Sequence, residues 1–316
     1  MEAGYHFGGY LTPVDHYADG AVYALFMSKS YALFSFMFGA GLGFQMQSAA
    51  RKGIAFGPRY SRRIIGLLIL GSLHFVFFFT GDILITYAIL GALLYRFRHT
   101  APKKLMIVGI ILIAIQALIY GLITAAIWLG TTFAPDDMPT TEAMMMEANL
   151  EVAAYQAETF WAVAQYRFSQ FYIAPLVALI QGFSVLGYFL IGLAAVKVGV
   201  INNPSAAIWK KLRHYALPIG LAGNIYAAWL MSTAQNGFTD VRFFTSMTIV
   251  GIFAPLLAFG YAGLIAAYAD GPVTPIKRFL ARAGSATLTA YLMQSVILSY
   301  IFSGYGLGLY AQLGAA

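Results

Sequence analysis

The sequence lacks cysteine and has few charged residues. With no cysteine among its 316 residues, it can form no disulfide framework, no thiolate nucleophile and no cysteine-ligated metal site. Its five histidines have no zinc-motif spacing, so we predict no metal site. Only 10% of the residues are charged, whereas a soluble domain is nearer a quarter charged. So few charged residues cannot cover the water-exposed surface that a soluble domain of this size must have, which argues against a soluble protein.

Apolar residues take the place of the missing charge. They make up 60% of the chain, and the mean hydropathy is +0.74. Most of the eight uncharged stretches reach the roughly 20 residues that a membrane span needs. These stretches lack the alternation of apolar and polar residues that transmembrane strands show. A backbone in lipid must also satisfy its own hydrogen bonds, which favours helices. We predict an all-α polytopic membrane bundle, a single domain over 1–316, with about eight transmembrane helices near 30–50, 64–81, 83–95, 105–135, 168–196, 214–239, 243–269 and 283–316.

The charges that remain are sorted by side. Four loops of one parity hold 16 of the 19 basic residues, and the opposite loops hold 11 of the 12 acids. The positive-inside rule therefore places the basic loops in the cytoplasm. The net charge of +7 does not indicate nucleic-acid binding, because the basic residues are separated by apolar runs and form no contiguous patch. The expected partner is a lipid bilayer with anionic headgroups.

Two segments fall on the outer side in this topology. Residues 1–20 have neither the basic start nor the apolar core of a signal peptide. Either the first helix inserts as a reverse anchor, or a preceding helix is missing, and we favour the second explanation. Residues 134–167 form an outer-side loop with one helix, which we expect to lie on the membrane surface. The alternative is a lid over an outward-facing cavity.

The hairpin between Arg63 and Arg96 contains the strongest candidates for chemistry. His74 lies 11 residues from Arg63, or roughly 16 Å along a helix, which places it near the bilayer centre. An ionisable residue at that depth is a functional candidate by default. The alternative is a neutral histidine that is hydrogen-bonded to a neighbouring helix. Asp82, at the tight turn of the hairpin, either caps the second helix or contacts a substrate.

Three further patterns have both a structural and a functional interpretation. Arg62 and Arg63 are either topogenic charges or ligands for a phosphorylated donor. Gly39 and Gly43 form a small-xxx-small pair that permits close helix packing, including self-association of the chain. A polar stripe on the last span either bonds to other helices or lines a substrate cavity, and it consists of Thr287, Tyr291, Ser295 and Ser299, with Gln294 beside it.

Four segments together resemble the YeiB-like bacterial membrane proteins, which are defined by the domain of unknown function 418. They are residues 31–44, 62–94, 182–201 and 283–309, and the most specific pattern is His74 followed by Gly81-Asp82-Ile83-Leu84. The resemblance implies a bacterial inner-membrane protein, remotely similar to integral membrane acyltransferases that modify envelope sugars and lipids. A transport role has also been suggested for the family. The matching residues are Lys29, Gly39, Arg62, Arg63, His74, Gly81, Asp82, Tyr87, Thr289, Tyr291, Gln294 and Ser295.

The chain departs from the family pattern in two places. The family begins with an additional helix that carries an Arg-Gly motif, which agrees with the missing helix inferred from topology. The family also carries an arginine where this chain has Ser285. If either feature is essential for acyl transfer, the chain is inactive as it stands.

The leading hypothesis is a membrane acyltransferase in which His74 is the general base and Asp82 orients it or the substrate. Eight helical residues span roughly 12 Å, so the two side chains can meet only if the chain bends between them. The cofactor prediction is none beyond an acyl donor such as acyl-CoA. The alternatives are a transporter or permease for a small molecule and a non-catalytic envelope scaffold. The predicted substrate-binding residues are Arg62, Arg63, Thr289, Tyr291, Gln294 and Ser295.

Overall fold

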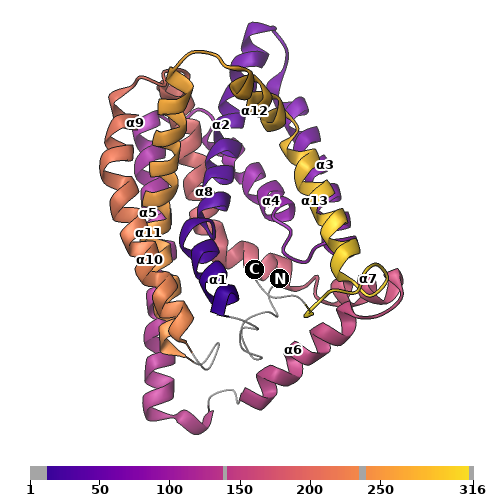
Figure 1. The fold of residues 1–316 in the computed structure, drawn as a ribbon. Helices are drawn as coiled ribbons and strands as arrows, with labels where there is room; N and C mark the ends of the chain where they lie inside the picture. Colours follow the sequence, from indigo (N-terminus) through magenta and orange to yellow (C-terminus); the bar gives the residue numbers. More distant parts are fainter. Residues whose placement is uncertain (1–12, 138–140, 235–239, 313–316) are drawn as a thin grey trace.

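The computed structural model describes residues 13–137, 141–234 and 240–312, and every regular element in these ranges is helical. Figure 1 shows the helices as an elongated bundle. The all-α prediction is therefore confirmed. The long helices are α1 (Pro13–Leu25), α2 (Lys29–Arg51), α3 (Phe56–Phe77), α4 (Leu84–Leu94), α5 (Pro102–Phe133), α6 (Thr141–Tyr155), α7 (Phe160–Ser169), α8 (Ile173–Lys197), α10 (Leu217–Thr233), α11 (Val241–Asp270), α12 (Pro275–Ser285) and α13 (Thr287–Phe302). Short helical turns are Tyr95–Phe97, Pro135–Asp137, Val200–Asn202, α9 (Ala207–Lys211) and the π-helix Leu212–Ala216.

The chain is a membrane protein by the length and composition of its helices. Five helical stretches are long and apolar enough to cross a bilayer: Val14–Arg51, Phe56–Phe77, Pro102–Phe133, Ala178–Lys197 and Val241–Asp270. A sixth is possible if α12 and α13, which are bent by 74°, count as one broken span. The predicted runs 83–95 and 214–239 form the shorter helices α4 and α10. The count of eight therefore stays a prediction.

The segment 134–167 differs from the single helix predicted for it. It forms two helices, α6 and α7, with a break between Tyr155 and Phe160. A tertiary contact lies at the break, because the Tyr155 carbonyl accepts a hydrogen bond from Gly304 N, far along the chain, at 2.8 Å. Thr159 then caps α7 by accepting from Ala162 N at 3.3 Å. Within the predicted outer segment 1–20, residues 1–12 lie outside the described part, and α1 begins at Pro13.

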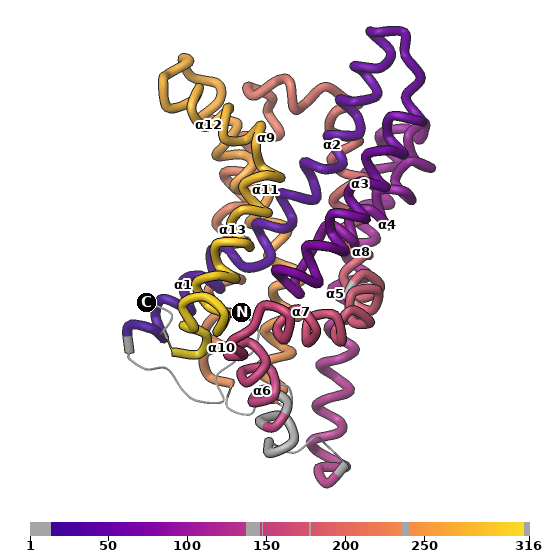
Figure 2. The backbone as a smooth tube through the Cα atoms, turned by 90° about the vertical axis from the view of Figure 1, so that its right-hand side faces the viewer, coloured from indigo at the N-terminus to yellow at the C-terminus, as the bar shows by residue number. Residues whose placement is uncertain are grey.

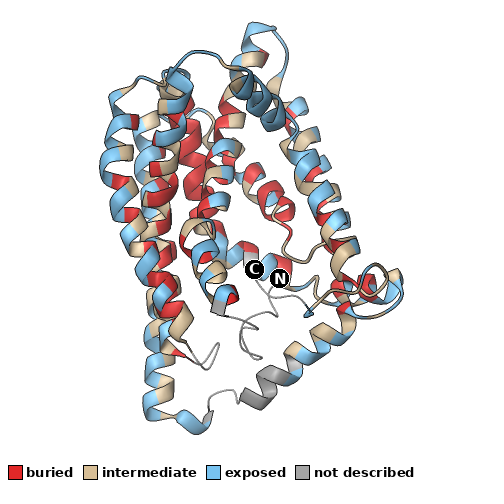
Figure 3. Cartoon of the chain, in the orientation of Figure 1, coloured by how far each residue is buried: buried red, intermediate tan, exposed pale blue. Residues whose placement is uncertain are grey.

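The core of the bundle is helix α8. Between Ser184 and Val196, nearly every residue of α8 is buried, as the red band in Figure 3 shows. It packs against α2, α4 and α5. Glycines make the contact with α2 very close: a Cβ added at Gly39 would lie 1.9 Å from the Phe189 carbonyl oxygen, and one at Gly192 would lie 1.9 Å from that of Phe36. Gly43 also faces α8, at Val196. The predicted small-residue face is thus occupied within the chain, and self-association through it would require α8 to move away.

The two ends of the bundle differ in charge. The α2–α3 turn, α9 and α12, which contain basic residues, all lie toward the top of Figures 1 and 2, with the α2–α3 turn and α12 on opposite sides of that end in Figure 2. Helix α6 lies toward the bottom of both views. The fold therefore brings loops that are far apart in sequence to a common basic end. Arg59, Arg62 and Arg63 lie inside α3, because this helix begins at Phe56, eight residues before the predicted span.

Candidate functional site

Helix α3 ends one turn after His74, and the chain then reverses. The amides of Phe78 and Phe79 both donate to the His74 carbonyl at 2.9 Å, which closes the helix. The chain runs without regular structure to Ile83, where α4 follows. Gly71, one turn before His74, leaves room for this return, because a Cβ there would lie 2.9 Å from Asp82 Oδ1 and 2.8 Å from Ile85 N. The reversal supplies the bend that contact between His74 and Asp82 requires.

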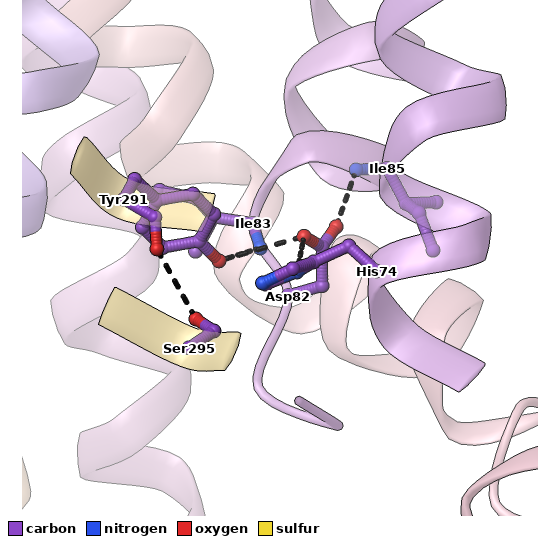
Figure 4. Close-up of polar contacts among 6 residues, drawn as sticks. All are labelled: His74, Asp82, Ile83, Ile85, Tyr291 and Ser295. Carbon is purple, nitrogen blue, oxygen red and sulfur yellow. Dashed lines mark hydrogen bonds and ion pairs between the residues drawn. The ribbon is translucent and has the colours of Figure 1, made fainter. Parts of the chain in front are cut away.

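His74 and Asp82 form a buried hydrogen-bonded pair. His74 Nδ1 lies 2.6 Å from Asp82 Oδ2, and the exposed fraction of His74 is 2% (Figure 4). The other carboxylate oxygen, Oδ1, accepts from Ile85 N at 3.0 Å at the start of α4. Asp82 therefore has the capping role that the sequence suggested, and it also contacts the histidine. Its contact with a substrate stays a prediction. A carboxylate that accepts from an amide and from a hydroxyl acts as an acceptor toward the ring as well, so Nδ1 carries the proton.

Tyr291 of α13 closes the pair from the other side. Its ring centroid lies 5.0 Å from that of His74, and its hydroxyl donates to Asp82 Oδ2 at 3.4 Å. The same hydroxyl accepts from Ile83 N at 3.4 Å. Ser295, one turn further along α13, donates to the Tyr291 carbonyl at 3.3 Å (Figure 4). The site therefore joins the consecutive helices α3 and α4 to α13, which lies about two hundred positions further along the chain.

The second ring nitrogen of His74 is available for chemistry. His74 Nε2 is buried and has no hydrogen-bond partner among the described residues. Because Nδ1 donates to Asp82, the lone pair is on Nε2. A carboxylate that holds an imidazole in this tautomer is the arrangement by which histidine acts as a general base. Among the described residues, no three His, Asp or Glu side chains gather to hold a metal ion.

The other predicted site residues divide into two groups. Tyr291 and Ser295 face the pair, whereas Thr289 and Gln294 lie on the exposed side of α13 and are not brought to it. Arg62 and Arg63 lie toward the basic end, roughly 16 Å along α3 from His74. Arg62 is exposed, but Arg63 places its guanidinium 4.6 Å from the Phe38 ring centroid. Its Nη1 is buried and has no hydrogen-bond partner within the described ranges.

Sequence reasoning did not identify Arg167, which is the largest fully buried side chain of the molecule among those described. It comes from α7, its exposed fraction is 1%, and its Nη1 donates to the Phe77 carbonyl at 2.6 Å, at the end of α3. One signal could have revealed it. Arg167 is one of only three basic residues that lie outside the four basic loops, and it follows the acid-rich outer segment.

Comparisons with known proteins agree on one family. The model of the family described as "Protein of unknown function (DUF418)" matches residues 195–316. The chain is 28% identical to the uncharacterized protein YxaH of Bacillus subtilis over 90% of its own length and 69% of that protein. It is also 28% identical to the uncharacterized protein YeiB of Escherichia coli, over 96% of its own length and 75% of that protein. No solved structure matches.

Proposed function

We propose, from the buried site of this chain, that it is a membrane acyltransferase with His74 as general base. The chain is similar to the DUF418 family and to YxaH and YeiB, and the description of that family names no function. The observation that carries the proposal is the free Nε2 of a histidine whose other nitrogen is held by a buried carboxylate. We place the chain in the bacterial inner membrane, with its basic end in the cytoplasm.

The reaction follows from the tautomer. Nε2 takes the proton of an acceptor hydroxyl while the hydroxyl oxygen attacks the carbonyl carbon of an acyl thioester. A carbon–oxygen bond forms, the carbon–sulfur bond breaks, and the protonated imidazole returns its proton to the leaving thiolate. The products are an ester and a free thiol. Asp82 keeps the ring in place and stabilises the imidazolium between the two proton transfers.

The donor would be held at the basic end. Arg63 is the group best placed to bind it, because its buried Nη1 has no partner among the described residues and its ring contact with Phe38 fixes the guanidinium. Arginine binds phosphate oxygens in a bidentate manner, which suits a phosphate-bearing thioester such as acyl-CoA. The distance of roughly 16 Å along α3 would be covered by the extended arm of such a donor.

The test of the proposed function is direct, because the chain contains no cysteine. Purified protein in proteoliposomes is incubated with acetyl-CoA and extracted bacterial envelope lipids and sugars, and released thiol is measured with a chromogenic disulfide. Thiol release that depends on both the protein and the acceptor extract supports acyl transfer. Its absence under all acceptor fractions contradicts the proposal.

Replacing Arg63 with glutamine is expected to raise the KM for acetyl-CoA at least tenfold and to change kcat little, since a hydrogen bond to a charged group contributes about 1.5–3 kcal/mol. The measurement is thiol release at varied acetyl-CoA. Arg59→Gln is the matched control, because Arg59 is an exposed arginine of the same helix. An unchanged KM in Arg63→Gln would remove Arg63 from the donor site.

A transport function is the second candidate, and the 74° break between α12 and α13 favours it. Broken helices and buried ionisable pairs occur at the sites of secondary transporters. In that case the vesicles would take up labelled hydroxylated solutes under an imposed proton gradient, and they would release no thiol. A non-catalytic envelope scaffold would show neither solute uptake nor thiol release, and it would tolerate substitution of His74.

A further inference from the structure

Arg167 is a buried cation with an incomplete set of partners. Its Nη1 donates to the Phe77 carbonyl at 2.6 Å, and its Nη2 donates to Ser299 Oγ at 2.9 Å and to Ser303 Oγ at 3.5 Å. The Tyr155 ring lies 5.1 Å from the guanidinium carbon. Nε is buried and has no partner among the described residues. A guanidinium has five N–H donors, so donors remain unused in a site that water does not reach.

Among the described residues, Arg167 forms no ion pair with a carboxylate: the ion pairs His74–Asp82 and Arg242–Asp240 do not include it. The Phe77 carbonyl at the C-terminus of α3 lies against the guanidinium and offsets part of its charge, because a helix C-terminus is equivalent to about half a negative charge. The contact with α13 is through the Ser299 hydroxyl. These contacts leave Nε without an acceptor. A buried charge is normally paired as well as hydrogen-bonded, so a formal negative charge is missing here.

Arg167 and His74 each make contacts that link α3 and α13. Phe77, whose carbonyl Arg167 contacts, is three residues after His74, or about 4.5 Å along the helix axis. Ser299 lies two turns after Tyr291 on α13, which packs on the His74 ring. Both groups therefore bridge α3 and α13, and both have one unpartnered nitrogen. A single small molecule could engage the guanidinium and the imidazole together.

We propose that Arg167 binds a phosphate or carboxylate group of the acyl acceptor, so that the substrate whose hydroxyl is acylated at His74 is an anion. This inference rests on the proposed function and adds the substrate class to it. The donor is assigned to the opposite, basic end of α3, so the anion held at Arg167 belongs to the acceptor. Nε and the Ser299 and Ser303 hydroxyls would supply the hydrogen bonds, and the planar fork suits an oxyanion.

Entry to the site would require the segment after α13 to move. Ser299 Oγ lies 2.5 Å from the Tyr305 hydroxyl, and the Phe160 and Tyr305 rings are 5.3 Å apart. Gly304 N bonds to Tyr155 at the end of α6, as described above. These contacts hold the segment against residues that surround Arg167, which contributes to the 1% exposed fraction of its side chain.

The experiment measures the thermal unfolding midpoint of the purified chain in a neutral detergent. Sodium phosphate, or phosphatidylglycerol in mixed micelles, is added at constant ionic strength. A ligand that binds only the folded state raises the midpoint in a saturable way, and a shift of about 3 °C or more is expected. A response to phosphate alone indicates a soluble anion, and a response to phosphatidylglycerol indicates a lipid headgroup. Either response supports the proposal if it requires Arg167.

Variants separate the possible outcomes. Arg167→Gln should lose the shift and Arg167→Lys should keep part of it, while Arg62→Gln, an exposed arginine at the other end, should keep all of it. If Arg167→Gln does not fold, the Ser299→Ala/Ser303→Ala chain, which retains the charge, should respond at several-fold higher concentrations. His74→Ala should respond like the wild type, so anion binding and acyl transfer can fail separately. A shift that persists undiminished when Arg167→Gln is combined with Arg63→Gln, which removes the proposed donor site, or no shift with either probe, overturns the proposal.

Discussion

His74→Ala is expected to lower the rate of thiol release from acetyl-CoA by about 10²–10⁴-fold, the range that a positioned general base contributes. The loss should appear in kcat and leave the KM for acetyl-CoA nearly unchanged, because the donor is bound at the other end of α3. Asp82→Asn should cause a loss of similar order, since an amide no longer selects the tautomer with its lone pair on Nε2. The measurement is the steady-state rate in proteoliposomes with saturating acetyl-CoA.

Matched controls for this prediction are available in the same chain. His99 is exposed on the α4–α5 connection, and Asp270 is exposed at the end of α11, so His99→Ala and Asp270→Asn should behave like the wild type. Midpoints of thermal unfolding show whether each variant is folded. A folded His74→Ala chain that keeps the full rate would eliminate His74 as the base. It would leave the transporter or the scaffold as the remaining functions.

Gly39→Ala is expected to lower the free energy of unfolding by about 3 kcal/mol, at the upper end of what an overpacked core side chain causes. The reason is geometric. The new methyl group would lie 1.9 Å from the backbone oxygen of Phe189, and a backbone atom of a buried helix cannot rotate away as a side chain can. Helices α2 and α8 must therefore separate, and the packing around Leu42 and Leu193 would open with them. The measurement is unfolding by sodium dodecyl sulfate in mixed micelles.

The control for this prediction is Gly66→Ala in α3. No heavy atom lies within 4 Å of a Cβ built at Gly66, so alanine there should be neutral or stabilising by up to about 1 kcal/mol from helix propensity. Gly192→Ala, on the partner helix, should resemble Gly39→Ala, because its Cβ would lie 1.9 Å from the Phe36 carbonyl oxygen. Equal stabilities of Gly39→Ala and Gly66→Ala would mean that the two helices are less closely packed than described.

The sequence was sufficient to select the class of the protein and a first candidate for its chemistry. The scarcity of charged residues determines that the chain needs a lipid environment. Uncharged runs in lipid must be helical, because their backbone N–H and C=O groups find no water there and must hydrogen-bond to each other. The same scarcity made His74 conspicuous, since an ionisable residue in the middle of an apolar run has few structural explanations. The sorting of basic and acidic loops was also visible, because it requires only the order of charges along the chain.

Only the tertiary structure decided which side chains meet. The approach of Asp82 to His74 depends on a helix that ends at Phe77 and a chain that reverses, and the bond from Tyr291 to Asp82 joins positions 209 residues apart. Periodicity placed Gln294 beside the polar stripe, but the rotation of α13 that exposes Gln294 and buries Ser295 is determined by its neighbours. Arg167 was missed for the same reason: burial of an arginine on a ten-residue helix depends on serines more than 130 residues away. Local composition determines the solvent and the secondary structure, whereas a site requires long-range packing, which no local pattern encodes.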